Sequence, residues 1–144
     1  MTDSIDLVIN ALQTLVPSDD DSDNVGRLYN IFEGFRSLPG RERAMPTMFS
    51  LLECFPNAAL GSPGPLVHEI EAIAGYEPLL RESLHRQPTD FTVWMVNRIL
   101  NAKPPQEERK VWLNELQLVL KLPRSPDSTR ESATDFLEHQ GAAA

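Results

Sequence analysis

A histidine and two glutamates near the middle of the chain are the residues best suited to acid–base or metal chemistry. His68 is followed by Glu69 and then by Glu71, an opening typical of metalloprotease helices. That motif needs a second histidine four residues after the first, and Ala72 occupies the position. The zinc-protease interpretation therefore fails. His68 and Glu71 can still form a pair on one flank of the helix. The pair would serve surface hydrogen bonding and binding or, as an alternative, acid–base or metal chemistry.

Other potential nucleophiles lack the neighbours that catalysis requires. Cys54 lies at an apolar helix end without an adjacent base, so it is predicted to be a small core residue and not a nucleophile. His85 and His139 belong to separate polar segments, and no serine lies in a Gly-x-Ser-x-Gly turn. The loop 61–65 contains two prolines and no phosphate-binding pattern, so it is interpreted as a rigid turn. We therefore expect no catalytic residue, metal or cofactor, and a protein that is not an enzyme.

One predicted helix carries residues suited to partner binding. Its wheel places Trp94 in one sector with three polar residues, Asn97, Arg98 and Asn101. Tryptophan and arginine are enriched among the residues that dominate binding energy. The alternative is a central, buried helix whose asparagines and arginine bind loop carbonyls and helix ends.

Acidic residues are concentrated near the N-terminus. The formal net charge is −8, and six aspartates precede the first basic residue, Arg27. A field of this sign repels nucleic acid and anionic lipid and speeds association with a basic partner. The run 18–24 is therefore either a solvated loop that caps the next helix or a docking patch. The candidate partner-binding residues are Asp19, Asp20, Asp21, Asp23, His68, Glu71, Trp94, Asn97, Arg98 and Asn101.

Helical periodicity with Pro and Gly punctuation predicts about eight helices and no strand. The first five are expected over 4–16, 23–38 with Asp23 as N-cap, 46–55, from 65 onward, and 76–87. A sixth is capped by Thr89 or Asp90, a seventh starts at 106 and needs neighbours on two sides, and an eighth spans 127–139. In the second, the apolar stripe of Val25, Leu28, Tyr29, Ile31, Phe32, Phe35 and Leu38 is expected to be core.

These elements indicate an all-α fold of stacked antiparallel α-hairpins or a compact bundle. Short connections favour antiparallel neighbours, and the absence of a residue-level repeat leaves a HEAT-like solenoid as a weak suggestion. With 144 residues, 41% of them hydrophobic and 24% charged, the chain has the size of one globular domain. We expect a single helical domain over 1–140 and a disordered tail over 141–144.

The location is expected to be the cytoplasm. The N-terminal apolar segment carries Asp3 and Asp6 where a secretory signal carries Lys or Arg. No apolar run is long enough to span a membrane, and the lone cysteine cannot form an internal disulfide. A soluble protein of a reducing compartment is therefore predicted.

Three segments, GSPGPLVHEIE at 61–71, YEPLLRESLHRQPT at 76–89 and WMVNRILN at 94–101, resemble bacterial immunity proteins that accompany polymorphic toxins, including contact-dependent inhibition and Rhs-type effectors. The resemblance covers about forty residues in the middle of the chain. It implies a small helical antidote that binds the C-terminal domain of its cognate toxin and blocks it without catalysis. Immunity proteins diversify at their contact surfaces, so the resemblance assigns no particular contact residue.

The sequence thus favours an immunity protein with a basic toxin domain as partner and no direct contact with nucleic acid or membrane. An acidic inhibitor would cover the cationic groove of such a toxin and associate faster through electrostatic steering. Two alternatives remain open: a helical adaptor without a toxin partner, and a small enzyme that uses His68 and Glu71.

Overall fold

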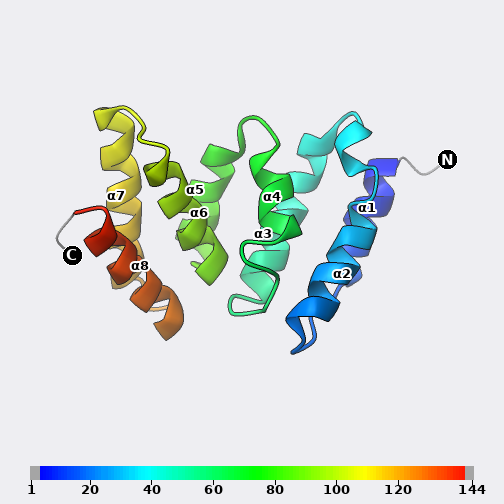
Figure 1. Ribbon diagram of the computed structural model, residues 1–144, viewed down its shortest axis with the longest axis horizontal. Helices are drawn as coiled ribbons and strands as arrows, with labels where there is room; N and C mark the ends of the chain where they lie inside the picture. The colour runs from blue at the N-terminus through cyan, green and yellow to red at the C-terminus, as the bar shows by residue number, and fades with distance from the viewer. Residues whose placement is uncertain (1–3, 142–144) are drawn as a thin grey trace. The chain divides into compact units, whose positions relative to one another are not determined.

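The computed structural model describes residues 4–141, which form eight α-helices and two short 3-10 helices without a strand (Figure 1). The predicted all-α class is confirmed. Contacts between Cα atoms group the chain into two compact units, Met1–Leu79 (unit 1) and Leu80–Ala144 (unit 2). The single domain over 1–140 stays a prediction. Of the predicted tail, Gly141 forms a turn and 142–144 lie outside the described residues.

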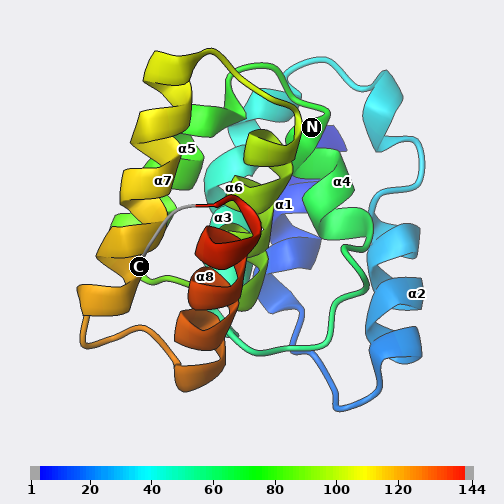
Figure 2. The same cartoon turned by 60° about the vertical axis from the view of Figure 1, so that its left-hand side comes forward.

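Unit 1 contains two helical hairpins and the first residues of a fifth helix. The first contains α1 (Ser4–Thr14) and α2 (Asp21–Ile31), and the second contains α3 (Met45–Cys54) and α4 (Pro65–Glu71). Between them lie the 3-10 helices η1 (Phe35–Ser37) and η2 (Arg41–Ala44). Because α1 packs on α3 and α2 packs on α4, the hairpins stack with corresponding helices adjacent (Figure 2). The core between them is apolar and includes Ile5, Leu12, Leu28, Phe35, Met48, Phe49, Leu52, Leu66 and Ile70.

Unit 2 contains most of α5 (Tyr76–Arg86), together with α6 (Asp90–Asn101), α7 (Gln106–Lys121) and α8 (Asp127–His139). As predicted, α7 has neighbours on two sides, because it packs against both α6 and α8. Helix α8 also packs on α6, and its residues Ala133 and Leu137 are buried. Side chains of the central helix α6 are buried along most of its length, including Val93, Met95, Val96 and Leu100.

Two helix starts show how local sequence sets these boundaries. Thr89 caps α6 in a capping box with Thr92, in which each side chain bonds the other's backbone N–H, so one of the two predicted caps is confirmed. The predicted cap of α2 is wrong. Asp20, not Asp23, accepts from the first free N–H groups of that helix, those of Ser22 and Asp23.

The predicted end of the second helix is also wrong. α2 stops at Ile31 rather than continuing to residue 38. Gly34 adopts a left-handed conformation with φ 73°, which a continuous α-helix does not allow, and the chain turns there into η1. The predicted core stripe is confirmed only in part: Leu28, Phe32 and Phe35 are buried, and Tyr29 is 60% exposed. The other three members, Val25, Ile31 and Leu38, are half-buried.

Among the described residues, none of the helices combines the length and apolar character that crossing a bilayer would require.

Candidate functional site

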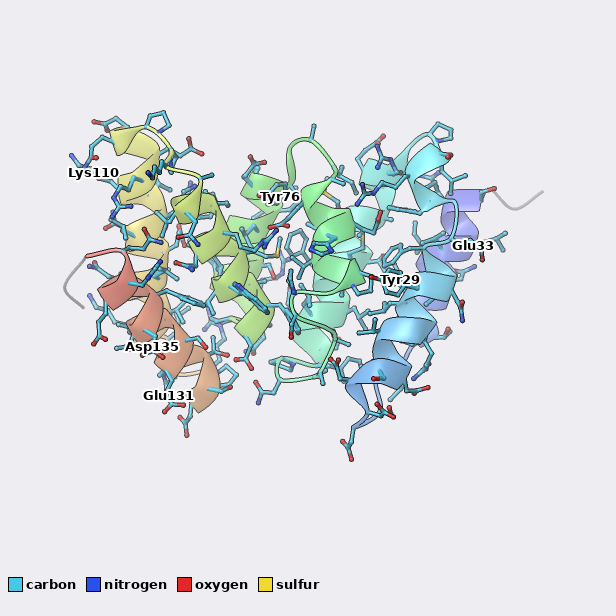
Figure 3. The ribbon with its side chains drawn as sticks, in the orientation of Figure 1. Tyr29, Glu33, Tyr76, Lys110, Glu131 and Asp135 are labelled. Carbon is cyan, nitrogen blue, oxygen red and sulfur yellow. The ribbon has the colours of Figure 1, made fainter. Side chains whose placement is uncertain are left out.

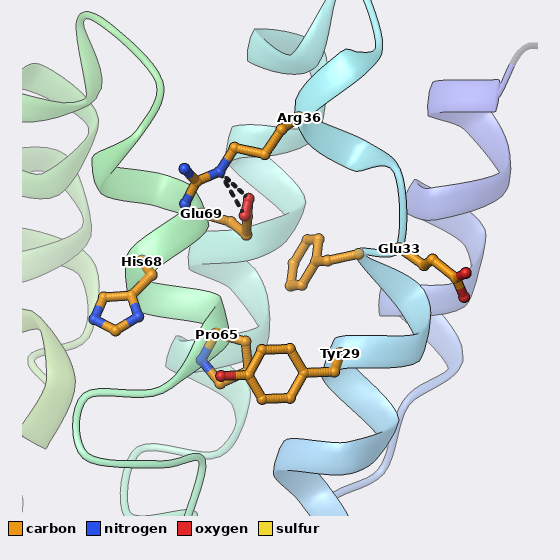
Figure 4. Close-up of a pocket in the computed structure, with 7 residues that line it drawn as sticks. Tyr29, Glu33, Arg36, Pro65, His68 and Glu69 are labelled. Atoms are coloured by element: carbon orange, nitrogen blue, oxygen red, sulfur yellow. Dashed lines mark hydrogen bonds and ion pairs between the residues drawn. The ribbon is translucent and has the colours of Figure 1, made fainter.

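A cavity of about 330 Å³ opens on unit 1 between the end of α2, η1 and α4. Figure 4 shows the side chains of Tyr29 and Pro65 along one side and the Arg36–Glu69 pair along another. Tyr29 turns toward Pro65, while Glu33 points away from them. The residues that line the cavity are Tyr29, Phe32, Glu33, Arg36, Pro65, His68 and Glu69.

An ion pair across the hairpins forms the polar wall of this cavity. Arg36 Nε lies 2.6 Å from Oε1 and 3.0 Å from Oε2 of Glu69. The Glu69 side chain is only 9% exposed, whereas Arg36 is largely exposed. Hydrogen bonding to Glu69, and secondly its negative charge, raises the pKa of Arg36 above its ordinary value. The charged form of the guanidinium is thus favoured, and its two contacts with Glu69 place it beside that carboxylate.

Two backbone turns bring these walls together. After Gly34 the chain enters η1, where Phe35 is buried and the next residue, Arg36, reaches the surface. On the other side the loop before α4 contains Gly61 and Gly64, both with positive φ. A Cβ at Gly64 would lie 2.0 Å from the Leu60 carbonyl oxygen, so only glycine permits this close turn.

The cavity offers hydrogen-bond donors beside apolar surface. Among the described residues, neither terminal guanidinium nitrogen of Arg36 has a hydrogen-bond partner. The ring of Phe32 meets that of Phe35 edge to face, with centroids 5.2 Å apart, which fixes the cavity floor. Exposed Tyr29 and His68 border the opening. Such a surface can bind a group that is apolar at one end and accepts hydrogen bonds at the other.

The predicted His68 and Glu71 both lie on α4, but the structure gives them different surroundings. His68 is exposed at the cavity, whereas Glu71 is half-buried. Within residues 4–141 no three His, Cys, Asp or Glu side chains come together as metal ligands would. The carboxylate that shapes the site is Glu69, to which the sequence analysis assigned no role beyond the rejected metalloprotease motif.

The acidic run is built into the hairpin structure of unit 1. Asp20 caps α2, Asp21 Oδ1 accepts from the backbone N–H of Gly61 at 2.8 Å, and Asp23 accepts from the Ser18 hydroxyl. Asp19 is exposed and has no hydrogen-bond partner in the described part of the chain. The capping role weighed for this run is therefore present, and all four carboxylates remain at the surface.

Asn24, the last residue of this run, has a structural role that the sequence did not indicate. It is fully buried, and its amide group bonds both the backbone N–H and the carbonyl of Ser18. It also donates to the carbonyl of Ala59 at 2.8 Å. One side chain thus joins the loop before α2 to the loop before α4.

The predicted partner-binding residues on α6 lie in unit 2, and most of them contact other residues of that unit. Asn97 is buried, and the amide of Gln140 donates to both Asn97 and Asn101 at 2.8 Å. Trp94 is half-buried and stacks on Phe91, with ring centroids 6.1 Å apart. Arg98 is half-buried as well. Asn97 thus agrees with the alternative of a central, buried helix, whereas Asn101 is exposed and bonds the same Gln140 side chain.

A second buried carboxylate organises α5 and α7 in unit 2. The side chain of Glu115 is 6% exposed, and Oε1 accepts from Arg81 Nε at 3.0 Å. Nε2 of His85 lies 2.7 Å from Oε2 of the same glutamate. This three-residue cluster was not predicted, because arginine, histidine and glutamate are common on exposed helix surfaces and give no signal of burial. It ties two helices together and leaves the side chains of Arg81 and His85 about half exposed.

A smaller cavity of about 160 Å³ lies between α1 and α3 in unit 1, and exposed Cys54 is among the residues that line it. Its other lining residues include Leu12, Leu15, Leu51 and Phe55, so its walls are mainly apolar. The prediction that Cys54 is a core residue is wrong, because the thiol lies at the surface at the end of α3.

The sequence matches no protein-family model, and comparisons with curated proteins and with solved structures give no significant match.

Proposed function

We propose that this chain is an immunity protein that binds a cognate bacterial toxin domain and neutralises it by covering its active site. The observation that carries the proposal is the distribution of charge. Unit 1 contains 12 acidic and 4 basic residues, whereas unit 2 contains nine of each. The entire formal net charge of −8 thus belongs to unit 1, which also has the cavity lined by exposed Tyr29.

A unit with this charge attracts a basic protein over a range of about one Debye length, roughly 8 to 10 Å at physiological salt. The same field opposes binding to phosphate backbones and anionic lipids. A toxin that acts on an anionic substrate needs a cationic groove, and an acidic inhibitor is complementary to that groove. The resemblance of segments 61–71, 76–89 and 94–101 to immunity proteins supports the same partner class.

The mechanism is binding without turnover. Electrostatic attraction raises the association rate, while a few desolvated contacts supply most of the affinity. The contacts between Arg36 and Glu69 exist before binding, which reduces the entropic cost of ordering Arg36 when a partner arrives. Access of substrate to the toxin is then blocked by the bound helical protein.

The test is co-expression with the C-terminal domain of the large protein encoded immediately upstream. Survival of cells that this domain otherwise kills, together with co-purification of a complex, is the expected result. A helical protein of similar size and net charge serves as control, because it separates specific neutralisation from non-specific binding of a basic domain. If the upstream domain is expressed intact, is harmless alone and forms no complex, a helical adaptor for another partner is the better assignment.

A further inference from the structure

The charges around the unit 1 cavity restrict what it can receive. A cationic group inside would meet the Arg36 guanidinium, whose neighbouring carboxylate is already engaged through both oxygens. The other acidic lining residue, Glu33, points away from Tyr29 and Pro65 (Figure 4). An anionic group would meet Glu69 and the net charge of −8 on the same unit. A neutral group therefore fits best inside, while the surrounding field favours a basic surface outside.

The residues that line the cavity and its volume indicate which kind of neutral group it can hold. Tyr29, Phe32 and Pro65 present rings to the cavity, and rings prefer edge-to-face or offset contacts with other aromatic groups. A volume of about 330 Å³ is at the lower limit of typical small-molecule pockets, roughly 300–1,000 Å³. It therefore suits a single inserted side chain better than a cofactor. The unpaired terminal nitrogens of Arg36 are placed to donate to a carbonyl oxygen at the entrance.

We propose that this cavity receives an aromatic side chain from a basic surface of the toxin domain, with Arg36 donating hydrogen bonds to the main-chain carbonyl beside it. This inference rests on the proposed immunity function. Tyr29 is the residue through which the contact is best tested, because it is 60% exposed and its removal leaves the core intact. Figure 3 labels its position on α2 together with that of Glu33.

The experiment compares three variants of the full chain in binding to the purified upstream-encoded toxin domain. Tyr29→Ala is expected to raise the Kd by about 10-fold or more, as truncation of an interface anchor does. Tyr29→Phe keeps the ring and is expected to bind within about 3-fold of wild type. Leu7→Ala is the matched control, because Leu7 is 59% exposed on the same unit but does not line the cavity.

The outcomes separate the cavity contact from the immunity function. If the wild type binds and neutralises the toxin but Tyr29→Ala does so equally well, the cavity contact is refuted and the function stands. Equal losses for Leu7→Ala and Tyr29→Ala also refute it. If the wild type does not bind at all, the immunity function and the cavity contact both fail. Circular dichroism of each variant excludes loss of fold as the cause.

A second measurement identifies the occupant. A photoreactive phenylalanine analogue at position 29 is expected to cross-link to a segment of the toxin that contains an aromatic residue flanked by Lys or Arg. Cross-linking to an acidic segment, or none in a complex that forms with wild-type affinity, contradicts the proposed occupant. Mass spectrometry of the cross-linked peptide reads out the result.

Discussion

Two buried glutamates occupy equivalent positions in the helices that carry them. Glu69 lies within the apolar stripe formed by Leu66, Ile70 and Ile73, and Glu115 lies within that of Trp112, Leu116 and Val119. Each is the i+3 member of an i, i+3, i+4, i+7 pattern, which directs its carboxylate toward the packed face. A buried carboxylate is costly unless it is paired. Arg36 pairs with the first, and Arg81 and His85 with the second.

Asn24 is a buried polar residue whose side chain makes several hydrogen bonds to the backbone of unit 1. We predict that Asn24→Ala lowers the free energy of unfolding by about 2 kcal/mol, because the backbone groups of Ser18 and Ala59 lose their partner. Urea denaturation measures the change. Asn30→Ala, an exposed substitution on the same helix, should alter stability by less than about 0.5 kcal/mol. Equal effects of the two substitutions would contradict the role assigned to Asn24.

At the scale of elements, glycines decide where helices and loops change direction. Gly34 ends the turn after α2, and Gly64 precedes α4 at the close approach to Leu60. Both have positive φ, but a Cβ at Gly34 would meet nothing within 4 Å, whereas one at Gly64 would meet backbone. At Gly34, a side chain would therefore be disfavoured only by the backbone conformation. At Gly64, it would be disfavoured both by the backbone conformation and by a steric clash.

The two glycines should therefore respond differently to substitution. Gly34→Ala is expected to cost about 1 kcal/mol, the penalty for a left-handed residue with a Cβ. Gly64→Ala should cost clearly more, because the Leu60 carbonyl must move. Gly26→Ala lies inside α2 with nothing within 4 Å of the new Cβ, and it should stabilise by about 0.5–1 kcal/mol. Thermal unfolding of the three variants gives the ranking, and a different order would refute this account.

At the scale of the whole molecule, the net charge is distributed unevenly between the two units. Unit 1 has an excess of eight acidic residues and unit 2 has none. Under the proposed function, long-range attraction of a basic partner would arise from unit 1, while Asp20, Asp21 and Asp23 are also engaged in local bonds. Asp19 is the member of the run whose charge can be removed without breaking a hydrogen bond of the described structure.

Asp19→Asn is expected to slow association with the toxin domain by about 2-fold at low salt. The difference should disappear near 1 M salt, where the Debye length is about 3 Å. Glu131→Gln removes one carboxylate from α8 of unit 2 (Figure 3), and it should change the rate less. Stopped-flow kinetics measures both variants. Rates that do not depend on salt, or equal effects of the two substitutions, would show that steering from unit 1 is wrong.

Helix α5 contributes residues to both units, since the division falls between Leu79 and Leu80. Because a helix forms cooperatively, we expect the chain to unfold in one transition, as one domain over 1–140 would. Both tryptophans, Trp94 and Trp112, belong to unit 2, so their fluorescence reports that unit alone. Circular dichroism reports all helices. Coincident denaturation midpoints are expected, and separated midpoints would establish two independent domains.

The sequence by itself determined the helical class, most helix boundaries and the uneven charge. Local signals carry this information: Pro46 and Pro65 lie in the first turns of α3 and α4, and Thr89 caps α6. The early stop of α2 escaped prediction because Gly34 is compatible with a helix until packing selects its left-handed conformation. The function and the proposed contacts with a partner stay predictions.

Only the tertiary structure decided which side chains meet. Arg36 and Glu69 are 33 positions apart in the chain, and Asn97 and Gln140 are 43 apart. No local pattern encodes such pairs, because they depend on how one hairpin stacks on the next. A glutamate within an apolar stripe signals that a buried carboxylate needs a partner, but the partner becomes known only when the helices are packed. The cavity beside Tyr29 follows from that same packing.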